Sequence, residues 1–96
     1  MDSRSAESQM LERCVAFAAG KATAAVSQQE ANVCRVAGMI VGSRFREESR
    51  RLLAAGDHYF QTHPHEFVEP GEVVRRGWIV SFPRLREGLY RRFEGK

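Results

Sequence analysis

The chain contains 96 residues, of which 43% are hydrophobic and 28% are charged, and this composition predicts one small globular domain rather than a disordered or fibrous chain. Its net charge of +3 resides mainly in residues 63–96, where seven basic and five acidic side chains give a modest electrostatic footprint for an acidic partner. Two cysteines are too few for a disulfide scaffold, no apolar run approaches the roughly 20 residues of a membrane span, and the polar start resembles neither a secretory signal nor a typical transit peptide.

Residues 5–26 carry the spacing of a first helix. Apolar side chains recur there every three or four positions, which places them on one helical face. Ser5 and Glu7 favour a helix start, because acids stabilise the positive end of a helix. Gly20 interrupts the apolar face and predicts either a kink or the close approach of another chain. The apolar positions are Leu11, Cys14, Val15, Ala18, Ala22 and Val26.

A second helix is expected to begin after Ser27. Ser27 followed by Glu30 three positions later is a capping-box pattern, in which the two side chains satisfy free backbone amides of the first turn. The apolar face of this helix ends at Phe45. Gly38 and Gly42 share one face, and they are explained either by a closely packed neighbour or by simple tolerance of small residues.

Residues 44–51 are almost wholly charged, which fits either a solvated bend or the solvated surface of a helix. Helical spacing resumes at Leu52 and predicts a third helix of about 12 residues. His63 ends this helix, because it precedes Pro64 and proline disfavours the helical conformation of the residue before it. Residues 1–62 are therefore interpreted as a three-helix bundle.

Residues 63–96 differ in character from the predicted bundle. Prolines and glycines recur every six or seven residues from Pro64 to Pro83 and leave no space for a long element. Residues 84–93 are long enough for two or three helical turns, and residues 78–82 form a short apolar patch that needs cover. We interpret residues 63–96 as an extended basic arm lying over a surface, so the predicted fold is all-α with a C-terminal arm.

The side chains that most often carry chemistry have simpler interpretations here. Three histidines within residues 58–65 lack further metal ligands of matching type, so no metal is expected. In a helical hairpin that turns near Ser27, Cys14 would face Val41 rather than Cys34, which predicts two reduced thiols without a disulfide. No serine or cysteine has the sequence context of an activated nucleophile, so catalysis is not expected.

The interpretation that remains is a protein that acts by binding partners. The predicted core is rich in alanine, which fills little volume and leaves room for an apolar group between the helices. The arginine pairs of the arm, together with Trp78, Tyr90 and Phe93, also suggest binding of single-stranded nucleic acid. Glu87 and Glu94 interrupt this basic stripe and weaken that interpretation.

Three segments carry a resemblance to a known family. Residues 43–47 read Ser-Arg-Phe-Arg-Glu, and residues 52–57 read Leu-Leu-Ala-Ala-Gly-Asp. Residues 63–65 read His-Pro-His and are followed by Pro-Gly at 70–71 and Arg-Arg at 75–76. In order and spacing these segments resemble the LYR-motif proteins of mitochondria, and most of all the accessory-subunit type at the distal end of the membrane arm of respiratory complex I.

The chain departs from the pattern of that family at its signature. The tripeptide stands as Leu11-Glu12-Arg13, with a glutamate in place of the aromatic residue. An intact Leu-Tyr-Arg at residues 89–91 lies at the opposite end of the chain and is interpreted as coincidence.

The resemblance implies a three-helix LYR-like bundle followed by the arm. It implies a non-catalytic accessory subunit of mitochondrial complex I (NADH:ubiquinone oxidoreductase) in respiratory electron transport, peripheral on the matrix side of the inner membrane. Its partners would be membrane-arm subunits and the mitochondrial acyl carrier protein, whose acyl-phosphopantetheine would be the only prosthetic group nearby. A LYR-like assembly factor and a small RNA-binding or ribosome-associated protein stay open as alternatives.

By position, the resemblance also implies which residues meet these partners. Arginines at the helix ends would pair with the acids of the carrier. The carrier contacts would be Leu11, Arg13, Arg44, Phe45 and Arg46, and the acyl path would include Val15 and Leu53 as well. The arm would contact neighbouring complex I subunits through His63, Pro64, Pro70, Gly71, Trp78, Ile79 and Phe82.

Overall fold

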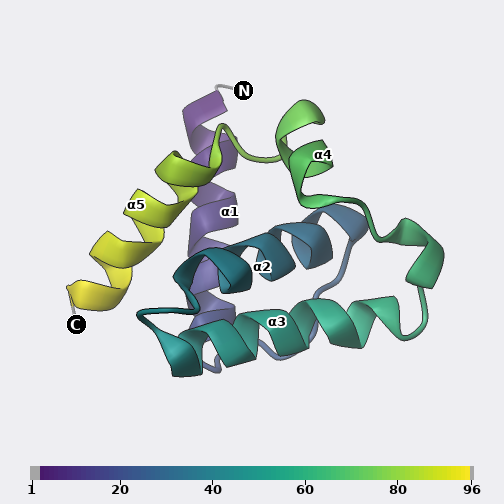
Figure 1. The fold of residues 1–96 in the computed structure, drawn as a ribbon, viewed down its shortest axis with the longest axis horizontal. Helices are drawn as coiled ribbons and strands as arrows, with labels where there is room; N and C mark the ends of the chain where they lie inside the picture. The colour runs from purple at the N-terminus through teal and green to yellow at the C-terminus, as the bar shows by residue number, and fades with distance from the viewer. Residues whose placement is uncertain (1–2, 96) are drawn as a thin grey trace.

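The computed structural model describes residues 3–95, and side chains from residue 7 to residue 95. This part of the chain is helical without strands, which confirms the all-α fold (Figure 1). None of its helices combines the length and apolar character needed to cross a membrane. The elements are α1 (Ser3–Ala18), α2 (Gln28–Val41), α3 (Arg46–Phe60), the short 3-10 helix η1 (Pro64–Glu66), α4 (Pro70–Arg75) and α5 (Phe82–Glu94).

Helices α2 and α3 form an antiparallel pair, and glycines set how closely they approach. A Cβ atom on Gly56 of α3 would lie 2.8 Å from the carbonyl oxygen of Ala31 in α2, a distance that real Cβ atoms do not tolerate. At the other end of the α2–α3 interface, Ser49 Oγ donates a 2.7 Å hydrogen bond to the carbonyl oxygen of Gly38. The closely packed neighbour of Gly38 is therefore α3.

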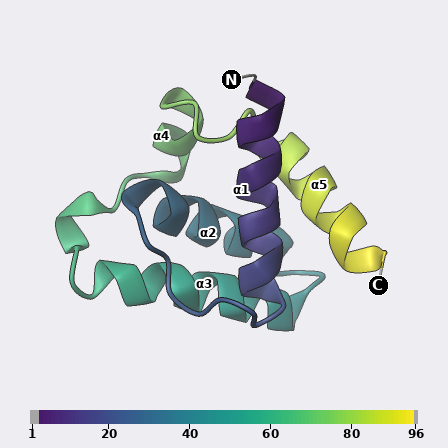
Figure 2. The same cartoon turned by 180° about the vertical axis from the view of Figure 1, so that it is seen from behind.

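Helix α1 ends at Ala18, eight residues before the predicted end at residue 26. Gly20 has a φ of +78°, a left-handed conformation that glycine adopts without strain and that breaks the helix. Arg51 of α3 donates a 3.0 Å hydrogen bond to the carbonyl oxygen of Ala18, which satisfies one of the free carbonyls at the helix end. Residues 19–27 then form a linker that passes α3 before α2 begins (Figure 2).

The predicted start of α2 is confirmed. Ser27 is the N-cap residue, and its side chain accepts a 3.1 Å hydrogen bond from the backbone N–H of Glu30. The carboxylate of Glu30 accepts from the N–H of Val26 instead of Ser27. The capping box is thus closed one residue earlier than the pattern predicts.

Residues 63–96 are not an extended arm, and this corrects the prediction. Residues 63–95, the part of this segment that the structure describes, fold into η1, α4 and α5, and α5 packs against both α1 and α2 (Figures 1 and 2). Leu85, Leu89 and Phe93 recur every four residues and are all buried, so α5 is an amphipathic helix with one face in the core. The proline punctuation marks helix starts, because Pro64, Pro70 and Pro83 each occupy a first-turn position.

Candidate partner-binding surface

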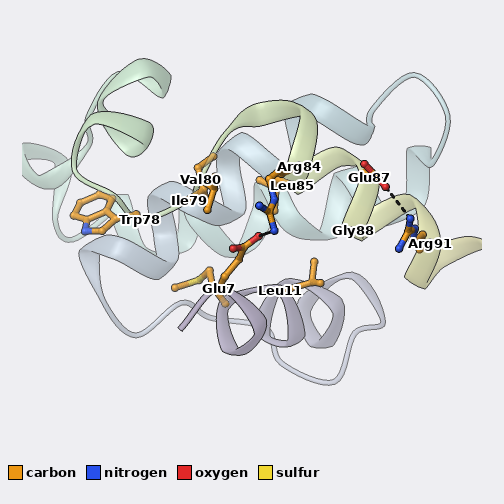
Figure 3. A pocket seen from close by; sticks show the side chains of 11 residues that line it. Glu7, Leu11, Trp78, Ile79, Val80, Arg84, Leu85, Glu87, Gly88 and Arg91 are labelled. Atoms are coloured by element: carbon orange, nitrogen blue, oxygen red, sulfur yellow. Dashed lines mark hydrogen bonds and ion pairs between the residues drawn. The ribbon is translucent and has the colours of Figure 1, made fainter. Parts of the chain in front are cut away.

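A cleft with a volume of about 440 Å³ lies between the first half of α1 and α5 (Figure 3). Its floor is apolar and comes from α1, α5 and the segment before α5. Two ion pairs border it: Arg84 lies 3.3 Å from Glu7 across the cleft, and Arg91 lies 2.8 Å from Glu87 within α5. The apolar lining residues are Met10, Leu11, Trp78, Ile79, Val80 and Leu85.

This cleft suits an apolar group with a charged end. Its volume lies in the range of about 300–1,000 Å³ that is typical of small-molecule sites, and its charged lining residues are two arginines and two glutamates that form ion pairs. The described residues that line it include no serine, cysteine or histidine. What the cleft offers chemically is therefore apolar contact and electrostatic attraction.

Leu11 is the predicted carrier contact that the structure places in the cleft. It packs against Gly88 of α5, since a Cβ atom on Gly88 would be 3.2 Å from Leu11 Cδ2. Val15 and Leu53 do not line the cleft, although both were expected to line an apolar path with Leu11. Leu53 instead packs against Gly38 in the α2–α3 interface.

Arg13 was expected to be available to a partner, but it is engaged within the chain. Its Nε and one terminal nitrogen bond the two carboxylate oxygens of Glu30 at 2.9 Å and 3.2 Å. The hydrogen bond to Glu30 raises the pKa of the Arg13 guanidinium above its ordinary value. The same guanidinium lies 5.0 Å from the ring centre of Phe17. Arg13 therefore joins α1 to the start of α2.

Arg44 and Phe45 lie between α2 and α3, at the end of α5, and Arg46 is the first residue of α3. Arg44 forms an ion pair with Glu94 and stacks 5.3 Å from the ring centre of Tyr90. Phe45 meets Tyr90 edge-on, at 5.2 Å between ring centres. Arg46 is exposed and has no acidic partner among the described side chains. The predicted carrier contacts Leu11, Arg44 and Phe45 thus lie beneath α5.

The predicted arm contacts are used mostly within the chain. His63 stacks on Tyr59 with 4.2 Å between ring centres, which fixes the start of η1. Asn32 of α2 holds the segment after it: its amide donates to the carbonyl of Glu66 at 3.1 Å and its oxygen accepts from the N–H of Val68 at 3.0 Å. Pro64, Pro70 and Gly71 lie in the first turns of η1 and α4, where they shape these short helices.

The apolar patch at residues 78–82 was expected to be covered by other subunits. The structure corrects this for Ile79, which is buried by the chain itself, while Trp78 stacks against Arg76 at 5.2 Å. Val80 and Phe82 remain 50% and 36% exposed. Two of the four apolar residues in the segment thus stay open to a partner.

A second apolar surface was missed by sequence reasoning. A groove of about 240 Å³ is lined by Val36, Met39, Ile40, Pro70 and Phe82, from α2, α4 and α5. Met39 is 57% exposed although it lies within an apolar stretch of α2. The sequence did contain a signal for this surface. Met39 lies three positions after Val36, on a side of the helix that is away from the face shared by Ala37 and Val41.

Cys14 and Cys34 lie side by side, contrary to the expectation that Cys14 would face Val41. Both are free and fully buried, and their side chains are hydrogen-bonded to each other. The prediction assumed an antiparallel α1–α2 hairpin, whereas α1 crosses α2 (Figure 2). The hydrogen bond from Cys14, followed by burial, raises the pKa of the Cys34 thiol far above its ordinary value.

Five of the six arginines in residues 63–96 have acidic partners among the described side chains, and Arg86 is the exception. Arg84 pairs with Glu7 and Arg92 with Glu12, so both connect α5 to α1. Arg75 and Arg76 share Glu72 within α4. The excess positive charge of this segment is therefore largely compensated inside the chain.

We compared the chain with models of protein families, with curated proteins and with solved structures, and none of them matches it.

Proposed function

We propose that this chain is a non-catalytic accessory subunit of mitochondrial complex I, peripheral on the matrix side of the inner membrane. The observation that carries the proposal is that a chain of 96 residues leaves two apolar surfaces open, the α1–α5 cleft and the groove at Met39 and Phe82. Apolar side chains that stay exposed in a groove are candidate contacts for a partner. The sequence resemblance supplies the choice of complex.

The two surfaces would serve different partners. The groove at Met39 is lined by apolar residues, so it suits a neighbouring membrane-arm subunit. The cleft is lined by Arg84 and Arg91, each paired with a glutamate, and Arg46 at the start of α3 is exposed without an acidic partner among the described side chains. Basic groups beside an apolar surface suit an acidic acyl carrier protein, whose charge would steer its approach. The only prosthetic group involved would be the acyl-phosphopantetheine of that carrier.

The test is native-gel fractionation of mitochondrial membranes, with the chain followed by mass spectrometry. We expect it to migrate with complex I subunits at one copy per complex. Substoichiometric, transient recovery would favour an assembly factor instead. Recovery mainly outside mitochondria, or with ribosomes, would overturn the proposal.

A further inference from the structure

The segment that joins α4 to α5 leaves apolar side chains open. We call residues 75–86 the α4–α5 corner, and it lies on the same side of the molecule as the first turns of α1 (Figures 1 and 2). Five large apolar side chains are exposed in the part of the chain that the structure describes, and two of them, Val80 and Phe82, stand in the corner, separated only by Ser81. Gly77 turns the chain there with a φ of +75°, and nothing lies within 4 Å of the position of a Cβ atom on it. The corner is therefore an open part of the surface.

Arginines border these apolar side chains on both sides. The corner holds four arginines and no acid, at positions 75, 76, 84 and 86. Three of them form ion pairs, two with Glu72 and one with Glu7, and their side chains are 42–66% exposed. Exposed pairs of this kind hold their charges only weakly. Arg86 is exposed without an acidic partner among the described side chains, so four arginines against two glutamates leave the corner with an excess of positive charge.

Each aromatic ring of the corner lies beside one of these arginines. The Arg76 guanidinium lies 5.2 Å from the ring centre of Trp78. Phe82 and Arg86 stand four positions apart in α5, a spacing that brings side chains of adjacent turns next to one another. Tryptophan is enriched where lipid meets water, because its ring suits an apolar layer and its N–H a polar one. Apolar side chains bordered by cations are typical of segments that lie in a membrane surface.

The small size of the open patch favours a lipid surface over a folded protein. A stable protein interface takes about 20–30 residues from each partner. The corner has 12 residues, of which Ile79 is buried and Trp78 is partly covered by the chain itself. A lipid surface requires no matching shape, and anionic headgroups attract arginine side chains.

We propose that the α4–α5 corner docks on an anionic lipid surface. Val80 and Phe82 enter the layer between headgroups and acyl chains, and the arginines around them pair with headgroup phosphates. Phe82 also lines the groove at Met39, so lipid would meet the chain beside that groove. The inference goes beyond the proposed function and does not rest on complex I, because it is carried by the exposed side chains of the corner.

The chain carries its own reporter of this contact, since Trp78 is its one tryptophan. The full chain is titrated with vesicles of phosphatidylcholine that contain about 40% phosphatidylglycerol, and with vesicles of phosphatidylcholine alone, at about 100 mM salt. We expect the emission of Trp78 to move to shorter wavelength with the anionic vesicles and to stay unchanged with the neutral ones. Raising the salt to about 500 mM should weaken the binding, because salt screens the attraction between arginines and headgroups.

Two variants of the corner have matched controls in the linker between α1 and α2. Sedimentation with the anionic vesicles measures the partition coefficient of each, and circular dichroism checks that each is folded. Arg86→Gln should lower the coefficient about fivefold, the contribution of one arginine near an anionic surface, whereas Lys21→Gln removes another exposed cation without an acidic partner among the described side chains. Val80→Ser should lower it roughly two- to fivefold, whereas Val26→Ser changes a valine that is 75% exposed. Both controls should bind like the parent.

The results separate lipid docking from the alternatives. If the parent does not sediment with anionic vesicles, or if the controls lose as much binding as the corner variants, the inference is refuted. If Val80→Ser binds like the parent and soluble polyglutamate shifts the emission of Trp78 as the vesicles do, the corner is a site for an acidic protein and lipid docking is overturned. The native-gel result that tests the proposed function is independent of these outcomes, so each inference fails separately.

Discussion

The ion pair between Arg13 and Glu30 changes the role that is assigned to Arg13. The Glu30 side chain is only 8% exposed and accepts three hydrogen bonds, two from Arg13 and one from the backbone of Val26. A buried carboxylate that loses its partner is strongly destabilising, because the remaining charge is left without compensation. The principal role of Arg13 in the free chain is thus to fix α1 against the start of α2.

The variant Arg13→Glu tests this role. We expect it to lower the free energy of unfolding by about 1–3 kcal/mol, less than for a fully buried pair because Arg13 is 43% exposed. Urea unfolding followed by circular dichroism measures the change. Arg46→Glu is the control, since Arg46 is exposed without an acidic partner among the described residues, and it should stay within about 0.5 kcal/mol of the parent. Equal stability of the two variants would contradict the assigned role.

The buried thiol of Cys34 makes stability depend on pH. Its pKa is raised above the ordinary value of 9.0, so the folded chain keeps this proton where the unfolded chain releases it. The stabilisation is complete below pH 9 and is lost as the pH rises further, with a slope of up to about 1.4 kcal/mol per pH unit. Denaturant titrations between pH 7 and pH 10.5 should show a smaller decline for Cys34→Ala than for the parent. Parallel declines would refute the prediction.

At the scale of the elements, the α2–α3 pair depends on the absence of one side chain. A Cβ on Gly56 would meet the carbonyl oxygen of Ala31, which is backbone and cannot move aside, and the stem of Arg35 at 2.6 Å. We expect Gly56→Ala to destabilise the chain by about 1–2 kcal/mol, although alanine is the better helix former. Gly71→Ala is the control, because its Cβ would meet only the flexible end of Arg75. Thermal unfolding of both variants measures the difference.

The elements also show which parts of the fold the sequence could predict. Local signals were sufficient for the start of α2, because Ser27 and Glu30 act through bonds within a few residues. The end of α1 is set locally by Gly20, but the carbonyl that it frees is satisfied by Arg51, a residue 33 positions away, and the position of Cys14 depended on the crossing of α1 over α2. No local pattern contains either contact. The four-residue spacing of Leu85, Leu89 and Phe93 was visible, but the surrounding prolines were interpreted as breaks rather than as helix starts.

The candidate surface was predictable only in part, for a related reason. Sequence position indicated Leu11, Arg44 and Phe45 as neighbours of a partner, and the structure places all three together under α5. The helix that covers them lies more than 35 residues away in sequence, and its docking results from tertiary packing. Charge counting likewise indicated a basic segment without indicating its internal acidic partners.

For the molecule as a whole, the compensation of charge argues against nucleic acid as the partner. Among the side chains that the structure describes, Lys21, Arg46 and Arg86 are the cations without an acidic partner, and they come from different elements. Binding to single strands needs a continuous basic groove with aromatic residues along it. The folded chain offers separate charges instead.

We therefore expect no saturable binding of a 20-nucleotide single-stranded RNA below about 100 µM at 150 mM salt, measured by fluorescence anisotropy. The double variant Glu7→Gln and Glu12→Gln releases Arg84 and Arg92 from their ion pairs, and its affinity should be higher than that of the parent. A micromolar affinity of the parent that falls steeply with salt would contradict this expectation and restore the ribosomal alternative.

The contact between α1 and α5 has a consequence for folding during synthesis of the chain. The α2–α3 pair joins neighbours in sequence and is able to form once residue 60 has been made, but the side of α1 at Leu11 gains its cover from α5 only when residues 82–94 follow. At about 5–20 residues per second, this interval lasts roughly 2–7 s. A chain that stopped before residue 82 would leave the side of α1 at Leu11 uncovered, although α2 and α3 would still pack against the rest of the helix. Such a product would stay more accessible to proteases and chaperones than one that includes α5.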